Sequence, residues 1–218
     1  MAKVSFDNVL LATLAVCAFT VTGLLVRREL RADPNAPPPP RQVDHWQQYA
    51  ARGYIEGPSD AKVTMMVFGD FQCPYCRRFA TVTDSIHAEF PDVRIIERHY
   101  PLSSIHPVAY TAALAAECAG ESGKYGSMRS QLYSRQTMLE QGLWGMLAAY
   151  AGVSDTTALK RCVENRKHAD VVERDLADGR QLGVKATPTV MVNGTLFGVP
   201  PTSAELRRVL RAAGAQAR

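Results

Sequence analysis

The 218-residue chain has little excess charge of either sign. Its 25 basic and 21 acidic side chains leave a formal net charge of +4, and no basic stripe alternates with aromatic residues. Nucleic-acid-binding domains usually carry such a stripe, so the composition gives no support for a nucleic-acid partner. With 46% hydrophobic and 21% charged residues, the chain is instead typical of a globular protein with a buried core.

Cysteine is also scarce, with five residues in the chain. Cys73 and Cys76 form a close pair, whereas Cys17, Cys118 and Cys162 are single and far apart. A structural zinc site usually needs a second close pair of Cys or His residues. We therefore expect no bound metal and no other cofactor. An inert structural disulfide remains the alternative to a redox role for the close pair.

The N-terminus lacks a recognisable signal-peptidase site. The segment Val9–Val26 is uncharged and mainly apolar, and it lies between Lys3 and the pair Arg27-Arg28. Its length approaches the roughly 20 apolar residues that span a bilayer. We predict that residues 1–30 are an uncleaved transmembrane or signal-anchor helix. The alternatives are a cleaved signal peptide and a buried soluble helix.

The close pair stands in Cys73-Pro74-Tyr75-Cys76, after the strand-like run Val63–Phe68 and before a helix-like stretch. This order places the two thiols at a helix N-terminus. There the unpaired N–H groups and the positive end of the helix dipole stabilise a thiolate, and a two-residue spacer lets the second sulfur close on the first. The sequence predicts a reversible disulfide.

A second signal lies far downstream, where Pro188 opens an apolar run rich in β-branched residues. Proline cannot donate a hydrogen bond to a sheet. At a strand start it therefore marks an edge or a special peptide bond, such as a cis bond. An ordinary turn proline is the alternative when the segment is taken alone.

Apolar patterning divides the chain after the anchor into a linker and one domain. Residues 31–57 are rich in proline, which favours an extended spacer, and they include a short helix-like docking segment at Asp44–Arg52. Residues 58–218 form the domain, with a helical insert at about 106–165. Its expected elements are strands at Lys62–Phe68, Val93–His99 and after Pro188, helices at Cys73–Glu89, Lys167–Leu182 and Ser203–Ala213, and a hairpin turn at Asn193-Gly194.

These motifs together resemble one family. In chain order they are Phe71-Gln72-Cys73-Pro74-Tyr75-Cys76, Tyr100-Pro101-Leu102, His106-Pro107, Ala115-Ala116-Glu117-Cys118-Ala119, Ala186-Thr187-Pro188-Thr189 and Val192-Asn193-Gly194. From about Gly57 to the C-terminal helix, the chain is similar to the DsbA-like thiol:disulfide oxidoreductases, and more narrowly to their membrane-anchored bacterial branch. The resemblance implies an α/β, thioredoxin-like fold with a helical insertion.

The resemblance also implies roles for the residues of the pair. The sulfur of Cys73 exchanges with substrate, and Cys76 is the partner that closes the disulfide. Pro74 and Tyr75 support the site from within the spacer. The spacer lacks a cationic side chain beside Cys73, so we expect a less stabilised thiolate than a histidine there would give.

Further site residues follow from the same resemblance. Pro188 is expected to be cis and to face the pair, with the backbone of Thr187 pairing with an extended substrate. Asp70 matches the family pattern, either as a proton-transfer group or as the cap of a turn. Cys118 and Cys162 are expected to form a structural disulfide, and two buried free thiols are the alternative.

The chain departs from the family at Val67, where a buried acidic residue is expected six positions before Cys73. A carboxylate at that position would accept or relay the proton of Cys76. Its absence leaves this proton to water, to Asp70 or to a group that the sequence does not identify.

The implied function is oxidation of reduced or unfolded exported polypeptides by the Cys73–Cys76 disulfide. The family suggests a quinone-linked membrane oxidase as the partner that restores the disulfide. We expect a monomer, because only a short proline-rich linker precedes the core. The alternatives are a membrane-tethered holdase without turnover and a glutaredoxin-like reductase, since a Pro-Tyr spacer also occurs in glutaredoxins.

Evidence on location conflicts. Arg27, Arg28 and Arg31 outnumber Lys3 across the apolar segment, so the positive-inside rule places the domain in the cytoplasm. The family resemblance and the cysteine pattern suit an oxidising compartment instead. We give the cysteines more weight and predict an anchored domain on the extracytoplasmic side.

Overall fold

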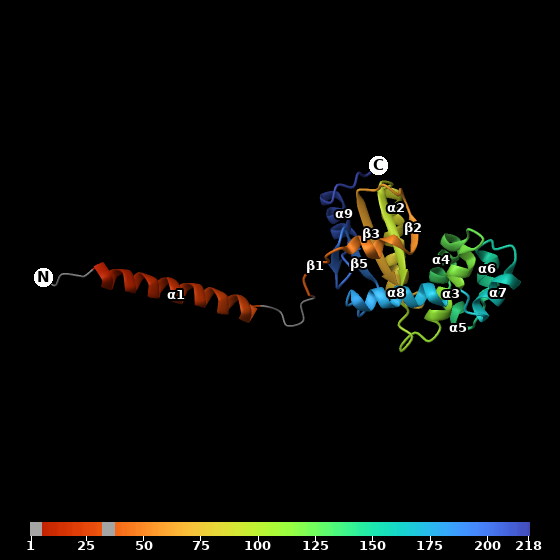
Figure 1. Ribbon diagram of the computed structural model, residues 1–218, viewed down its shortest axis with the longest axis horizontal. Coiled ribbons are helices and arrows are strands. Elements are labelled where there is room, and N and C mark those ends of the chain that lie inside the picture. The colour runs from red at the N-terminus through yellow and green to blue at the C-terminus, as the bar shows by residue number, and fades with distance from the viewer. Residues whose placement is uncertain (1–5, 32–37) are drawn as a thin grey trace. The chain divides into compact units, whose positions relative to one another are not determined.

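The computed structural model describes residues 6–31 and 38–218 (Figure 1). The chain forms two compact units, Met1–Pro38 and Pro39–Arg218. The boundary between them falls inside the proline-rich segment 31–57, in which the sequence analysis placed the linker.

The first unit contains one helix, α1 (Phe6–Arg31). Where its side chains are described, the large apolar ones are exposed: Leu14, Val16, Phe19, Val21 and Leu24. Within the described residues, no helix is both long enough and apolar enough to cross a membrane. The membrane anchor therefore stays a prediction.

The second unit is built on one six-stranded sheet. Its strands are β1 (Arg41–Gln42), β2 (Tyr54–Glu56), β3 (Val63–Gly69), β4 (Val93–His99), β5 (Thr189–Val192) and β6 (Thr195–Phe197). The order across the sheet is β1-β6-β5-β3-β4-β2, with β3 and β4 parallel and the other pairs antiparallel. Helix α2 (Pro74–Glu89) makes the connection between the parallel strands, as a crossover requires.

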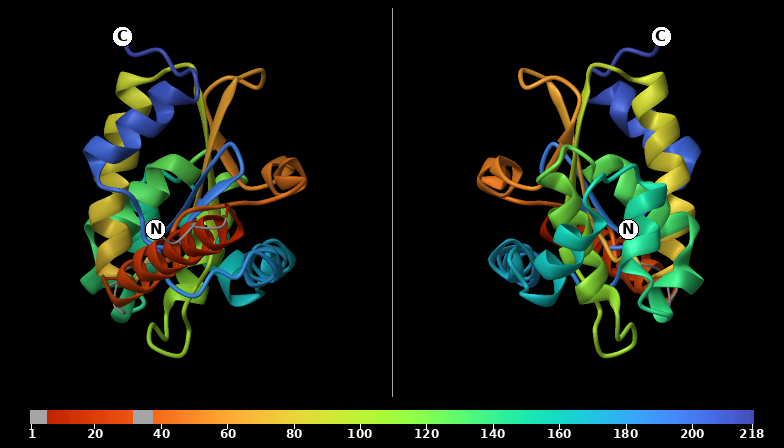
Figure 2. Two further views of the ribbon diagram at one scale, coloured as in Figure 1. Left: turned by 90° about the vertical axis from the view of Figure 1, so that its left-hand side faces the viewer. Right: turned by 90° about the vertical axis from the view of Figure 1, so that its right-hand side faces the viewer.

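Side chains of β3 alternate between two apolar clusters, one on each face of the sheet. Val63, Met65 and Val67 pack with α2 and with α9 (Ser203–Ala212) on one face. These two helices lie side by side there (Figure 2), and Arg207 of α9 bridges to Glu89 at the end of α2. Both faces of the central strand are therefore buried, which explains its nearly continuous apolar sequence.

The opposite face of the sheet packs against α8 (Ala169–Gln181) and the short 3-10 helix η1 (Trp46–Ala51). Arg98 of β4 is fully buried on this side. Its guanidinium bonds Asp175 Oδ1 of α8 at 2.6 Å and the carbonyl oxygen of Tyr49 in η1 at 2.6 Å. The charge is paired as burial demands, and η1 docks on the domain as the sequence predicted.

Between β4 and α8 the chain forms the helical insert. Its helices are α3 (Ala109–Gly120), α4 (Tyr125–Ser134), α5 (Gln136–Glu140), α6 (Trp144–Tyr150) and α7 (Thr156–Glu164). They bury an apolar cluster of their own, which also takes in both cysteines of the close pair. The insert therefore forms one wall of the region around the pair.

Candidate active site

Cys73 lies at the junction between β3 and α2, where it is the N-cap residue of the helix. Pro74 follows as the first helical residue, where its missing N–H costs no hydrogen bond. Cys76 lies one turn into the helix. Both cysteines are free thiols and both are buried, with 4% and 2% of their surface exposed, whereas Tyr75 is 64% exposed.

The loop that contains Thr187 reaches the pair from the other side. The peptide bond between Thr187 and Pro188 is cis, and Cys73 Sγ lies 3.5 Å from the carbonyl oxygen of Thr187. Cys76 Sγ instead accepts a hydrogen bond from the backbone N–H of Asp70 at 3.4 Å. The structure therefore brings together residues that are separated by more than half of the chain.

The two thiols differ strongly in acidity. Hydrogen bonding by the Cys76 thiol is the main cause that lowers the pKa of Cys73 to about 5, against the opposing effect of burial. Burial is the main cause that raises the pKa of Cys76, and the neighbouring Cys73 raises it further. Cys73 is therefore the thiolate of the pair and Cys76 its protonated partner, which are the properties of a nucleophile and a resolving thiol.

Asp70 is buried, and its carboxylate organises the loop in front of α2. Oδ1 accepts the N–H of Gln72 at 2.8 Å. Oδ2 accepts the N–H of Leu102 at 2.8 Å and lies 2.8 Å from Nδ1 of His106. These contacts are those of a turn cap, and only the backbone N–H of Asp70 contacts a sulfur.

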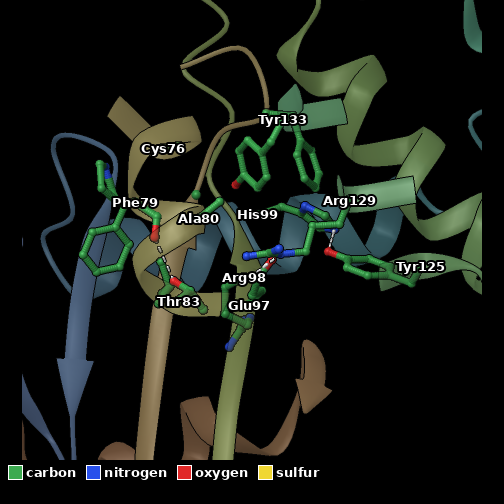
Figure 3. Close-up of a pocket in the computed structure, with 14 residues that line it drawn as sticks. Cys76, Phe79, Ala80, Thr83, Glu97, Arg98, His99, Tyr125, Arg129 and Tyr133 are labelled. Atoms are coloured by element: carbon green, nitrogen blue, oxygen red, sulfur yellow. Dashed lines mark hydrogen bonds and ion pairs between the residues drawn. The ribbon is translucent and has the colours of Figure 1, made fainter. Parts of the chain in front are cut away.

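A cavity lies behind the pair, between α2, β4 and α4 (Figure 3). The sequence analysis missed its polar residues. Glu97, Arg129 and Tyr133 line it together with Cys76, and Arg129 Nε donates to Glu97 Oε1 at 2.5 Å. Glu97 is one of several charged residues in the strand Val93–His99, and nothing in the sequence distinguishes it from Arg94 or Arg98. The register of β3 and β4 places it opposite Val67.

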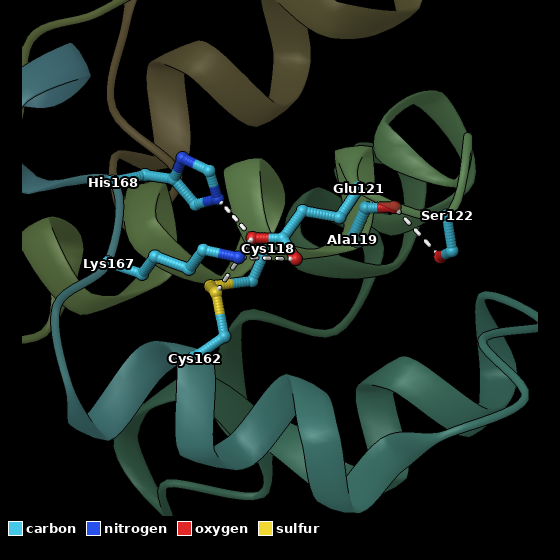
Figure 4. Close-up of a disulfide and its surroundings, with 7 residues drawn as sticks. All are labelled: Cys118, Ala119, Glu121, Ser122, Cys162, Lys167 and His168. Atoms are coloured by element: carbon cyan, nitrogen blue, oxygen red, sulfur yellow. Dashed lines mark hydrogen bonds and ion pairs between the residues drawn. A yellow bond between two sulfur atoms is a disulfide. The ribbon is translucent and has the colours of Figure 1, made fainter.

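Cys118 and Cys162 form a disulfide that joins α3 to α7 (Figure 4), with an S–S distance of 2.01 Å. His168 contributes a ring nitrogen nearby, and these three ligand-type atoms lie within 4.8 Å of one another. Because both sulfurs are bonded to each other, neither is a thiolate that could ligate a metal. His168 is instead paired with Glu121, with 2.6 Å between Nε2 and Oε1.

Comparison with known proteins shows which family this architecture resembles. Residues 50–212 match a family model described as thioredoxin. The chain is 33% identical over 166 residues to a protein of Mycolicibacterium gilvum named Na(+)/H(+) antiporter NhaA 1, covering 74% of the chain and 26% of that protein. It is 32% identical over 209 residues to a protein of the same name from Mycobacterium sp. strain KMS, covering 91% and 32%. The chain thus spans about a third or less of the length of these relatives.

Solved structures give the same result. Oxidised BdbD from Bacillus subtilis superposes with a TM-score of 0.66 at 25% identity, covering 73% of this chain and 91% of that one. Wolbachia pipientis alpha-DsbA1 superposes with a TM-score of 0.62 at 18% identity, covering 75% and 91%. The second likeness shows the fold alone.

The second unit thus combines a thioredoxin-like sheet, a helical insert and two free thiols at a helix N-terminus. The matched family model covers most of the second unit. The chain therefore belongs to the thioredoxin family.

Proposed function

We propose that this domain is a protein thiol:disulfide oxidase, which passes the Cys73–Cys76 disulfide to reduced exported polypeptides. The placement of the two free thiols at the N-terminus of α2 is the observation that carries the proposal, and the lowered pKa of Cys73 agrees with it. A thiolate stabilised in the reduced pair makes the reduced form more favourable and the disulfide correspondingly more oxidising. The hydrogen bond from Cys76 supplies that stabilisation without a cation in the spacer.

The exchange proceeds in two displacements. A substrate thiolate attacks Cys73 Sγ, the Cys73–Cys76 bond breaks, and Cys76 leaves with the electron pair and takes up a proton. A second substrate thiolate then attacks the substrate sulfur of the mixed disulfide, and Cys73 leaves as a thiolate. The substrate gains one disulfide, and the enzyme gains two electrons in its reduced pair.

The contact between the Thr187 carbonyl and Cys73 Sγ supports a substrate-binding role for this loop. A polypeptide extended along the loop would bring its thiol to the attacking position beside Cys73. Backbone pairing of this kind reads an extended chain with little dependence on its sequence. Unfolded exported proteins suit such a site, and a quinone-linked membrane oxidase suits the task of restoring the disulfide.

The proposed location is the extracytoplasmic side of a membrane. The Cys118–Cys162 disulfide supports an oxidising compartment, since structural disulfides are rare where thiols are kept reduced. The exposed apolar side chains of α1, among them Leu14, Phe19 and Leu24, support insertion of that helix into lipid.

The decisive measurement is turnover on a reduced, unfolded protein with glutathione disulfide as the terminal oxidant. We expect many disulfides formed per enzyme molecule, and none from the Cys73→Ser/Cys76→Ser variant. Client binding that survives in that variant, without turnover by the intact protein, would favour the holdase instead.

The redox potential separates an oxidase from a strongly reducing, thioredoxin-like reductase. Because the spacer has no cation, we expect a value between about −120 and −230 mV, less oxidising than the strongest oxidases. The measurement is equilibration of the pair with defined ratios of reduced and oxidised glutathione. A potential near that of thioredoxin, about −270 mV, would contradict the oxidase.

A further inference from the structure

Cys76 must lose or gain a proton each time the pair changes its redox state, yet it is buried. In the sequence, Val67 stands where the family resemblance implies an acidic residue, which leaves this proton to water, to Asp70 or to an unidentified group. Val67 has an apolar side chain, and the carboxylate of Asp70 is engaged with Gln72, Leu102 and His106. The proton therefore needs another partner.

The cavity behind the pair connects Cys76 with Glu97. Both residues line it, as do Val67 and Tyr133 (Figure 3). The space open to the centre of a water molecule is about 20 Å³, and one water needs about 10–15 Å³. Val67 and Glu97 stand opposite each other in the parallel pairing of β3 and β4, so the carboxylate of Glu97 lies on the strand next to Val67.

The surroundings of Glu97 act on its pKa in opposite directions. Burial is the main cause that raises its pKa, and Arg129 opposes that effect. Arg129 holds the carboxylate at 2.5 Å and reaches the exposed Asp84 at 2.8 Å on its other side. The charged or titratable groups that line the cavity with Glu97 are Cys76 of α2, Arg98 and His99 of β4, and Tyr125, Arg129 and Tyr133 of α4. Glu56 and Tyr54 of β2 and Asp84 of α2 interact electrostatically with Glu97.

We propose that Glu97 exchanges the proton of Cys76 through this cavity, in place of the carboxylate that Val67 lacks. The inference rests on the proposed redox function and names the group that serves it. When Cys76 leaves the disulfide, Glu97 in its acid form gives the thiolate a proton. When Cys76 attacks a mixed disulfide on Cys73, the Glu97 carboxylate accepts the thiol proton while the bond from Cys73 to the departing sulfur breaks.

The two steps can be separated with 5,5′-dithiobis(2-nitrobenzoic acid) in the full chain carrying Cys17→Ser. Attack by Cys73 releases the first thionitrobenzoate, and attack by Cys76 on the resulting mixed disulfide releases the second. For Glu97→Gln we expect the second release to be slower by about a hundredfold near neutral pH, the lower end of the range for general acid–base catalysis. We also expect it to depend more steeply on pH, while the first release is unchanged.

Asp84→Asn is the matched control. It removes the same charge from the same arginine, but Asp84 is exposed and does not line the cavity. We expect its second release to keep the wild-type pH profile. An Asp84→Asn profile shifted as far as that of Glu97→Gln would overturn the inference, because the effect would then belong to Arg129.

The outcomes also separate this inference from the proposed function. Absence of both releases in the protein with wild-type Glu97 would defeat the redox function itself. Two normal releases with the same second-step profile in Glu97→Gln would defeat only the role of Glu97. If that variant does not fold, carboxyl ¹³C NMR of the wild-type protein decides, because Glu97 must titrate at a different pH in the reduced and oxidised forms; identical titrations would overturn the inference.

Discussion

At the scale of single residues, the site depends on an asymmetry between two chemically identical side chains. Cys73 caps the helix and receives the hydrogen bond of its partner, whereas Cys76 lies in the apolar interior. One sulfur is thereby a good leaving group and nucleophile, and the other keeps its proton. The same local sequence without this difference in environment would be an ordinary disulfide.

The asymmetry predicts different outcomes for two serine variants. Cys73→Ser should abolish exchange, since the remaining thiol is buried and protonated. Cys76→Ser should instead accumulate long-lived mixed disulfides between Cys73 and substrates, because no internal thiol resolves them. Non-reducing electrophoresis with mass spectrometry of the adducts measures both. Equal trapping by the two variants would contradict the assignment of roles.

The acidity of Cys73 predicts a pH profile. A thiol ionises as pH rises through its pKa, so a lowered pKa extends reactivity to lower pH. Alkylation of reduced protein carrying Cys17→Ser should reach half its maximal rate near pH 5, rather than near the free-cysteine value of about 8.5. Cys76→Ala should move the midpoint upward, because it removes the hydrogen bond that stabilises the Cys73 thiolate. A wild-type midpoint near the free value would refute this.

At the scale of helices and strands, the helical insert is held together from within. The Cys118–Cys162 bond spans 44 residues and joins the first and last helices of the insert. A cross-link over a loop of this length stabilises by up to about 4 kcal/mol in the chain-entropy model. The insert lines the cavity behind the pair through Tyr125, Arg129 and Tyr133, so its order bears on the site.

Removing this bond should lower the melting temperature. We expect Cys118→Ala/Cys162→Ala to lose several degrees, since about 1 kcal/mol corresponds to 2–4 °C in a domain of this size. Differential scanning calorimetry measures the change, and mass spectrometry without reductant shows whether the bond is formed. A Cys17→Ser variant serves as the control, because that residue is outside the domain. An unchanged melting temperature would deny the bond structural weight.

The longer elements were predictable because their apolar patterns are long. β4 was predicted at its observed bounds, and β3, α2 and α9 to within a residue at each end. β1 and β2 were not predicted, since two and three residues hold no recognisable period. Likewise, Cys73 and Cys76 were readable from local spacing, whereas Glu97 and Arg129 meet only through strand register and the packing of the insert, which local sequence does not specify.

At the scale of the whole chain, location is the property on which sequence signals disagree. The arginines after the apolar segment favour a cytoplasmic domain, and the cysteine chemistry favours an oxidising compartment. The Cys118–Cys162 disulfide in the insert also favours an oxidising compartment.

An alkaline phosphatase fused after Arg218 tests the location. That enzyme needs an oxidising compartment to form its own disulfides, so we expect an active fusion. A green fluorescent protein fused at the same position serves as the complementary reporter. An expressed but inactive phosphatase would contradict the extracytoplasmic oxidase and favour a reductase.

Tension on the chain would enter the domain at a particular strand. β1 is the first strand of the second unit, and its pairing with β6 involves Arg41 and Gln42 alone. β1 is an edge strand, and two strands, β6 and β5, lie between it and β3, so a pull from the N-terminal side loads its few hydrogen bonds first. Separation of β1 from β6 would leave β3, α2 and the thiol pair in their positions. We therefore expect a pulling force to separate the edge strand β1 from β6 before it deforms the region around the thiol pair.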